Sequence, residues 1–338
     1  MSTYTIPRGG NVEKAFATLP TDTTEVLFGG AHPVVRGDIV LPTWSLMIDG
    51  KMERLDLGQN SNGFVASVYG QADANVRIER KFIIRNFSEI KGGKKAVDLS
   101  ATFMSRVEDV ELVGQAETAI DLRFCLMATV QNVKVTLNKQ DGVRVRCGDW
   151  SGAGVSSSQS NSATIDRVRI YNGPTSSKAF AVQHANSCRM VQCVSEGYGP
   201  EYDLWLSATS GDAPYANNPV VKQFSLDGLH VEHGRYQASK ASVWVDMPSM
   251  CAVNLKQVYW NYTPNKPVIL YSLGQLILEQ VGWWTAAHKI ESRIQSPRIT
   301  VRDCSGGLSL SSVKLASDPI PGNTVLTPAY VIFQTTSK

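Results

Sequence analysis

The chain has 338 residues, of which 43% are hydrophobic and 19% charged, so its composition suits a large buried core and argues against disorder. Its 33 basic and 30 acidic side chains leave a net charge of only +3, which argues against nucleic acid as a partner. No run of 18 apolar residues predicts a membrane span, and the N-terminus MSTYTIPRGG lacks the apolar stretch of a signal peptide. We therefore expect a soluble protein made in a cytoplasm.

The N-terminal 50 residues predict one helix followed by irregular strands. Residues 11–19 (NVEKAFATL) have an amphipathic pattern, with Asn11 as a plausible N-cap. The segments TEVLFGG and DIVLPTWSLMIDG then predict short strands. A helix at this point would cover the open end of a stack of strands, where backbone groups are otherwise unpaired.

A short motif recurs every 23 residues in the segment that follows. Copies open with an apolar–x–apolar triplet at Val97, Ile120 and Val143, and a second apolar run comes 13 residues later, around Val110 and Val133. The same pattern of apolar runs continues with insertions between them. The later openings are Phe180, Leu204, Val243 and Val268.

These runs predict strands that stack in successive coils. Each run has three to six alternating or β-branched residues flanked by Gly, Asn, Ser or Asp, which is typical of strands. A 23-residue unit cannot bury its own apolar face, so the units must stack. The leucine and asparagine pattern of leucine-rich repeats is absent. We predict an all-β fold, a right-handed parallel β-helix with a short N-terminal capping helix; a β-sandwich with chance repetition is the alternative.

Composition divides the chain into three parts. The cap covers residues 1–50 and the β-helix residues 51–305. Residues 306–338 are Gly/Ser/Pro-rich and then contain the strand-like PAYVIFQTT, which predicts a tail that leaves the stack and pairs with a neighbouring subunit.

Three motifs resemble the pectate-lyase-like β-helix of bacteriophage tailspikes and tail fibres. They are LPxWxLxIxG over residues 41–50, the coil opened by Gly63, and GLHVEHG over residues 228–234. The resemblance covers roughly residues 20–305. It implies a homotrimer in the virion tail, synthesised in the host cytoplasm, with residues 1–50 near the virion and other tail proteins as partners. It also implies binding of a host cell-surface polysaccharide, which many relatives cleave, with no cofactor. We expect the protein to lack the long virion-adaptor domain and the large C-terminal trimerisation domain of the family.

Two long insertions and several aromatic side chains are candidates for glycan contact. The gaps from Val143 to Val168 and from Leu204 to Leu229 are 25 residues instead of 13, with the added residues in 149–162 and 207–219. Both insertions share one register, so they predict neighbouring loops; loop growth without a ligand is the alternative. Aromatic rings suit sugar stacking and a subunit interface equally. The predicted glycan-binding residues are Trp150, Tyr198, Tyr202, Tyr215, Tyr236 and Trp260.

The register also predicts a pair of catalytic carboxylates. Glu196 lies three residues after Cys193, and Glu232 three residues after Leu229, so the two occupy equivalent positions on consecutive coils. Stacked strands place such carboxylates about 5 Å apart, the separation in a retaining glycosidase. Glu201 and Asp203 lie close enough in sequence to replace one member. Chance stacking of acidic residues on a repetitive surface is the alternative.

Metal and thiol chemistry are not expected. His230 and His233 flank Glu232, but no third ligand is evident, so they are interpreted as surface histidines and no metal site is predicted. The six cysteines are scattered without zinc spacing, which predicts reduced thiols.

Three functions therefore compete. The first is a tailspike that attaches to host polysaccharide, with or without cleavage. The second is a trimeric knob or decoration protein of the virion without glycan activity, which the small size favours. The third is a free polysaccharide lyase or hydrolase, against which the missing signal peptide argues.

Overall fold

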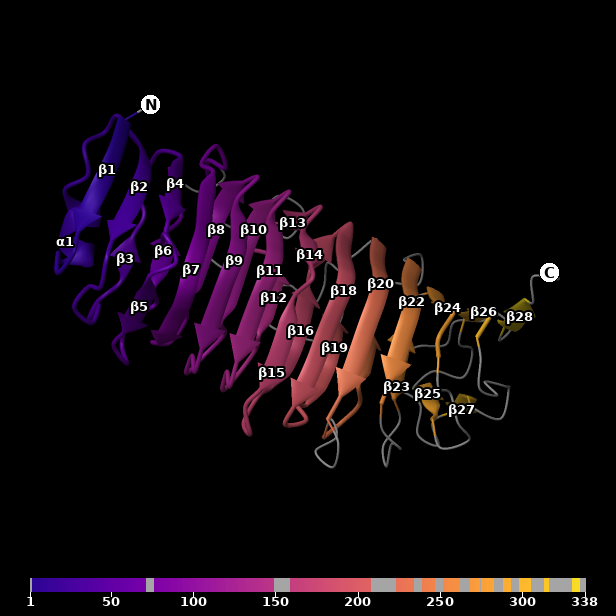
Figure 1. Cartoon of the computed structure of the whole chain (residues 1–338). Helices are drawn as coiled ribbons and strands as arrows, with labels where there is room; N and C mark the ends of the chain where they lie inside the picture. Colours follow the sequence, from indigo (N-terminus) through magenta and orange to yellow (C-terminus); the bar gives the residue numbers. More distant parts are fainter. Residues whose placement is uncertain are drawn as a thin grey trace.

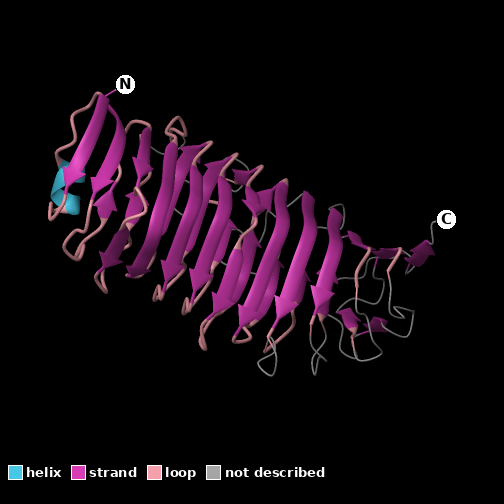
Figure 2. Ribbon diagram, viewed as in Figure 1, coloured by secondary structure: helices cyan, strands magenta, loops and turns pink. Residues whose placement is uncertain are grey.

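The computed structural model describes residues 2–70, 76–148, 159–207, 223–233, 239–246, 252–261, 268–273, 275–282, 288–292, 298–304, 313–315 and 330–334. In these residues the chain passes back and forth between two long sheets, sheet A and sheet B (Figure 1). Figure 2 shows the strands stacked side by side from the N-terminal to the C-terminal end. The registers within both sheets are parallel, so the protein is an all-β parallel β-helix, as predicted. Its handedness and a trimeric state stay predictions.

Within the described residues sheet A has 15 strands. They are β1 (Ser2–Pro7), β2 (Thr23–Gly29), β4 (Leu46–Asp49), β5 (Arg54–Leu57), β7 (Phe82–Gly92), β9 (Arg106–Val113), β11 (Thr129–Thr136), β14 (Thr164–Asp166), β15 (Arg169–Asn172), β18 (Cys188–Gly197), β20 (Gln223–Glu232), β22 (Ala252–Trp260), β24 (Gln275–Glu279), β26 (Arg298–Arg302) and β28 (Tyr330–Gln334).

Sheet B has 13 strands in the same part of the chain. They are β3 (Ile39–Val40), β6 (Phe64–Ala66), β8 (Val97–Phe103), β10 (Ile120–Leu126), β12 (Val143–Arg146), β13 (Ser160–Asn161), β16 (Lys178–Gln183), β17 (Ala185–Asn186), β19 (Tyr202–Ser207), β21 (Val243–Asp246), β23 (Ile269–Leu273), β25 (Ile290–Ser292) and β27 (Val313–Leu315).

The register of sheet B confirms the predicted openings of the coils. Val97 pairs with Ile120, Ile120 with Val143, and Val143 with Phe180. The register continues from Phe180 to Leu204 and on to Val243. The final opening is corrected by one position, because the residue paired with Val243 is Ile269 rather than Val268.

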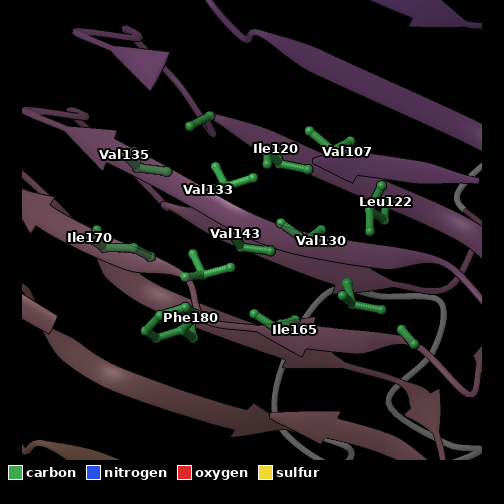
Figure 3. Packing of buried hydrophobic residues seen from close by; sticks show 14 of the residues in the cluster. Val107, Ile120, Leu122, Val130, Val133, Val135, Val143, Ile165, Ile170 and Phe180 are labelled. Carbon is green, nitrogen blue, oxygen red and sulfur yellow. The ribbon is translucent and has the colours of Figure 1, made fainter. Parts of the chain in front are cut away.

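The space between the two sheets is filled by apolar side chains (Figure 3). Val107 and Val130 of sheet A and Ile120 and Val143 of sheet B are all buried. Burying a side chain of this size stabilises the fold by about 1.5–3 kcal/mol. Because each coil adds such residues on both sheets, one continuous core runs along the stack.

The N-terminal segment forms helix α1 (Val12–Ala17), shorter than the predicted range 11–19. Asn11 is the N-cap, as predicted: its side chain accepts a 2.7 Å hydrogen bond from the backbone N–H of Lys14. The helix ends before Pro20 because the residue that precedes a proline disfavours helical backbone. The ring of Phe16 packs against Phe64 with 6.0 Å between centroids. A capping role for this helix stays a prediction.

Sheet A bends at one register where the backbone is left-handed in each successive coil. We call these nine residues the corner column. They are Asn86, Asp109, Asn132, Arg167, Gln192, Gly228, Gln257, Gln280 and Asp303, with φ between 48° and 91°. Left-handed backbone favours asparagine, aspartate and glycine. The side chains of the column are exposed, except that Asn86 is half-buried and Gly228 has none.

Candidate functional site

The predicted carboxylates meet on the outer face of sheet A. Glu196 of β18 pairs directly with Glu232 of β20, so the two occupy neighbouring strands about 4.8 Å apart. The preceding residues, Ser195 and Val231, are buried, and alternation along the strand therefore turns both glutamates outward. Glu196 is 13% exposed and Glu232 49% exposed. The predicted stacking is confirmed; its catalytic use stays a prediction.

The two glutamates differ in their partners. Arg169 of β15 donates two hydrogen bonds to Glu196, from Nε to Oε1 at 2.5 Å and from Nη2 to Oε2 at 2.9 Å. The hydrogen bonding and charge of Glu196 raise the pKa of Arg169. A carboxylate has about four lone-pair sites, so Glu196 keeps acceptor capacity beside this pair. Glu232 lies 3.7 Å from Nε2 of His230 through its Oε2.

A hollow of about 470 Å³ opens beside this pair, on the same face. It crosses strands β18, β20 and β22. The rings of His230 and Tyr259 meet edge to face on adjacent strands, with centroids 5.1 Å apart. The lining residues are Gln192, Cys193, Val194, Gly228, Leu229, His230, Gln257 and Tyr259. This hollow was not predicted from the sequence, although a glycine at a register otherwise occupied by polar side chains could have indicated it.

Asp203 is not available to a polysaccharide, which corrects its predicted catalytic role. Its side chain is fully buried between the sheets and accepts hydrogen bonds from the hydroxyls of Ser195 at 2.6 Å and Ser242 at 2.7 Å. His233 Nε2 lies 2.6 Å from the same carboxylate. Asp203 precedes the coil opening at Leu204, and this position points inward.

Trp260 and His233 belong to the same internal cluster, which corrects two further predictions. Trp260 is fully buried and donates from Nε1 to the Ser242 hydroxyl at 2.8 Å, so it cannot stack on a glycan. His233 was expected at the surface and is buried as well. The sequence pattern did not predict this buried cluster, because polar residues such as Asp203 and His233 are usually found at the surface.

The remaining predicted site residues are not members of the glutamate pair, and three of them lie outside the described residues. Glu201 is exposed and pairs with Lys240 at 3.1 Å. Tyr202 begins β19 of sheet B, with the Lys240 ammonium 5.6 Å from its ring centroid. Tyr198 is half-buried just after β18. The predicted glycan-binding residues outside the described part are Trp150, Tyr215 and Tyr236.

A charged network on sheet B escaped the sequence analysis. Asp98 and Asp121 occupy the middle of the apolar triplets and pair with each other in register. Asp121 is fully buried beside Lys95 at 3.0 Å and Arg144 at 2.9 Å. Burial alone would raise the pKa of Asp121, but Arg144 and Arg146 lower it overall. These ion pairs connect residues of consecutive coils. An aspartate at the middle position of two successive triplets is the sequence signal that could have indicated this network.

Neither a metal-ligand cluster nor a membrane-spanning helix is found in the described residues. Across this part of the chain there is no group of three or more His, Cys, Asp or Glu side chains suited to a metal ion. Nor does the described part contain a helix long and apolar enough to cross a membrane. Cys125, Cys147, Cys188 and Cys193 are buried free thiols in the described residues, and Cys304 is a half-buried one.

Comparison with known proteins gives a likeness in fold. Neither a protein-family model nor a curated protein matches the sequence. The structure is similar to the catalytic domain of a GH87 alpha-1,3-glucanase in complex with nigerose, with a TM-score of 0.51 and 11% identity over 99% of this chain and 68% of that one. A variant of such a domain in complex with tetrasaccharides gives a TM-score of 0.45 and 10% identity over the same shares. At this identity the first likeness supports the parallel β-helix fold.

Proposed function

We propose that this protein is a tailspike-type virion protein that binds a host cell-surface polysaccharide and hydrolyses it at Glu196 and Glu232. The observation that carries the proposal is the direct pairing of these two glutamates on an outer face of the stack. Residues that pair in register on neighbouring strands lie about 5 Å apart, and two carboxylates at that separation suit hydrolysis with retention of the anomeric configuration.

The partners of the two glutamates assign their roles. Glu196, oriented by Arg169, is the nucleophile: it forms a bond to the anomeric carbon as the glycosidic C–O bond breaks. Glu232, the more exposed of the two, gives its proton to the departing oxygen. Glu232 then takes a proton from water, whose oxygen attacks the anomeric carbon and releases Glu196 as a carboxylate.

Two further observations support a polysaccharide ligand. Tyr171 pairs with Glu196 in register and is 39% exposed, so its ring flanks the carboxylates. The fold is also similar to that of a glucanase catalytic domain. A tail location, a homotrimer and contacts with other virion proteins are part of the proposal and follow from the tailspike resemblance.

The test is incubation of the purified protein with surface polysaccharides of candidate hosts, with new reducing ends as the readout. We expect cleavage by the wild type and a loss of at least about a hundredfold in Glu196→Gln and in Glu232→Gln, the scale of acid–base catalysis. Glu201→Gln is the matched control, because Glu201 is an exposed glutamate paired only with Lys240 in the described residues, and it should retain full activity.

Three other results would revise the proposal. An unsaturated, ultraviolet-absorbing product would indicate a lyase and remove the assigned roles. Binding without cleavage would indicate a non-catalytic adhesin. Neither binding nor cleavage would favour a structural knob of the virion.

A further inference from the structure

The hollow on sheet A exists because one side chain is missing from the corner column. Gly228 stands in register between Gln192 and Gln257, whose long amide side chains occupy the same position on the neighbouring strands. A Cβ at Gly228 would lie 3.2 Å from Cα of Gln192, so even a small side chain would press on the adjacent strand. The glycine therefore leaves a gap with an amide on each side.

The groups around this gap are those that recognise hydroxyls. A glutamine amide carries two N–H donors and one carbonyl acceptor, and both glutamines are exposed. Gln257 gives one N–H to Oε1 of Gln280 at 3.3 Å, so its second N–H and its carbonyl oxygen are the groups offered to a ligand. Tyr259 and His230 add ring surfaces with polar edges. Among the described residues, those that line the hollow include no Asp, Glu, Lys or Arg. Its volume of about 470 Å³ lies in the usual range for small-molecule sites.

The gap is placed beside the proposed catalytic pair. His230 lines the hollow and reaches Glu232, two residues further along the same face of β20, at 3.7 Å. A ligand in the hollow would therefore lie beside the two glutamates, which are two residues further along β18 and β20. Strands β18 and β22 are two strand spacings apart, roughly 10 Å, so the hollow extends along the direction in which the coils stack.

We propose that the hollow at Gly228 is a subsite for an uncharged sugar unit of the polysaccharide, next to the unit whose linkage is cleaved. The inference rests on the proposed function. Gln192 and Gln257 bind the hydroxyls from two sides, and Tyr259 supports the ring. A uronic acid or another acidic sugar is disfavoured at this position, because the described residues that line the hollow include no Lys or Arg.

The test measures affinity for oligosaccharides prepared from the polysaccharide that the protein binds. Gly228→Asn places an amide in the gap, and asparagine tolerates left-handed backbone better than most residues. Because its Cβ would press on Cα of Gln192, thermal unfolding of this variant is measured together with Kd. We expect Kd to rise at least about tenfold, which corresponds to about 1.4 kcal/mol. Asn132→Gln is the matched control: it enlarges a side chain of the same column outside the hollow and should leave Kd within about twofold.

A second variant guards against misfolding. Gln257→Asn shortens one lining amide without filling the gap, and it should weaken binding while thermal unfolding stays unchanged. Wild-type binding together with unchanged Kd in Gly228→Asn and Gln257→Asn would overturn the subsite and leave the proposed function standing. No wild-type binding to any host polysaccharide would overturn both. A changed oligomeric mass in Gly228→Asn would instead identify the hollow as a contact between copies of the chain.

Discussion

At the scale of single residues, the least expected feature is an ion pair inside the core. Asp203 and His233 are both fully buried, with Oδ1 and Nε2 2.6 Å apart. Desolvation by burial lowers the pKa of His233, but the charge and hydrogen bond of Asp203 outweigh it, and the pKa is raised overall. The serine hydroxyls around Asp203 supply the hydrogen bonds that a buried charge requires.

The raised pKa of His233 predicts a pH-dependent stability. The stabilisation is fully present below the unfolded pKa of about 6.5 and is lost as the pH rises through the higher folded value. We expect His233→Gln to lower the free energy of unfolding by about 3–5 kcal/mol in mild acid, with a smaller loss in alkaline solution. Urea unfolding across this pH range measures the difference. His230→Gln, on the surface of the same segment, is the control, and parallel wild-type and His233→Gln curves would contradict the prediction.

Sequence reasoning located the glutamates but misjudged the residues around them. Glu196 and Glu232 could be paired because register depends only on counting from Cys193 and Leu229. The burial of Asp203 and Trp260 could not be predicted, because it depends on which polar groups meet across the core. The confirmed prediction is therefore the strand register, which follows from the repeat, and not the burial of individual polar residues.

At the scale of the element, small residues stand at the turn into sheet B. Ala96, Ala119, Gly142 and Ala179 precede the paired openings of successive strands, and the three alanines are fully buried. A Cβ on Gly142 would lie 2.5 Å from Cδ1 of Ile170 and 2.6 Å from the carbonyl oxygen of Ala179. The turn therefore has no space for a side chain at residue 142.

This packing predicts that Gly142→Ala destabilises the protein by about 1–3 kcal/mol, the usual cost of overfilling a core. Gly282→Ala is the matched control, since its Cβ would meet Cδ2 of Tyr259 at an ordinary 3.8 Å. The control should stay within about 0.5 kcal/mol of wild type. Urea unfolding of both variants is the measurement, and equal midpoints would show that Ile170 and the turn can move aside.

The coil openings could be predicted at this scale, and the last one shows the limit. Val97 to Val243 follow from alternation and spacing, because inward positions must be apolar in every coil. Val268 and Ile269 are both apolar and both buried, so pattern alone could not decide which of them pairs with Val243. For the short helix α1, the N-cap Asn11 was predicted correctly, but the helix ends at Ala17, two residues before the predicted end.

At the scale of the whole molecule, the surface carries apolar residues where the chain turns from sheet B to sheet A. Phe103 ends β8 and is 38% exposed, and Met127 follows β10 and is 50% exposed. Phe103 pairs with Leu126 in register, so the two exposed side chains come from adjacent coils. Apolar side chains clustered at one edge of a surface are typical of contacts between subunits.

The proposed homotrimer places this edge in its interface. Light scattering of the purified wild type should then give about three times the chain mass of 36.9 kDa. Replacing both exposed residues, in Phe103→Ser with Met127→Ser, should shift the mass towards one chain, because two apolar contacts would be lost in each subunit. Val34→Ser, at another exposed apolar residue, should leave the mass unchanged. A wild-type mass of one chain at micromolar concentration would contradict the trimer, whereas a trimer that survives the double substitution would place its interface on another face of the stack.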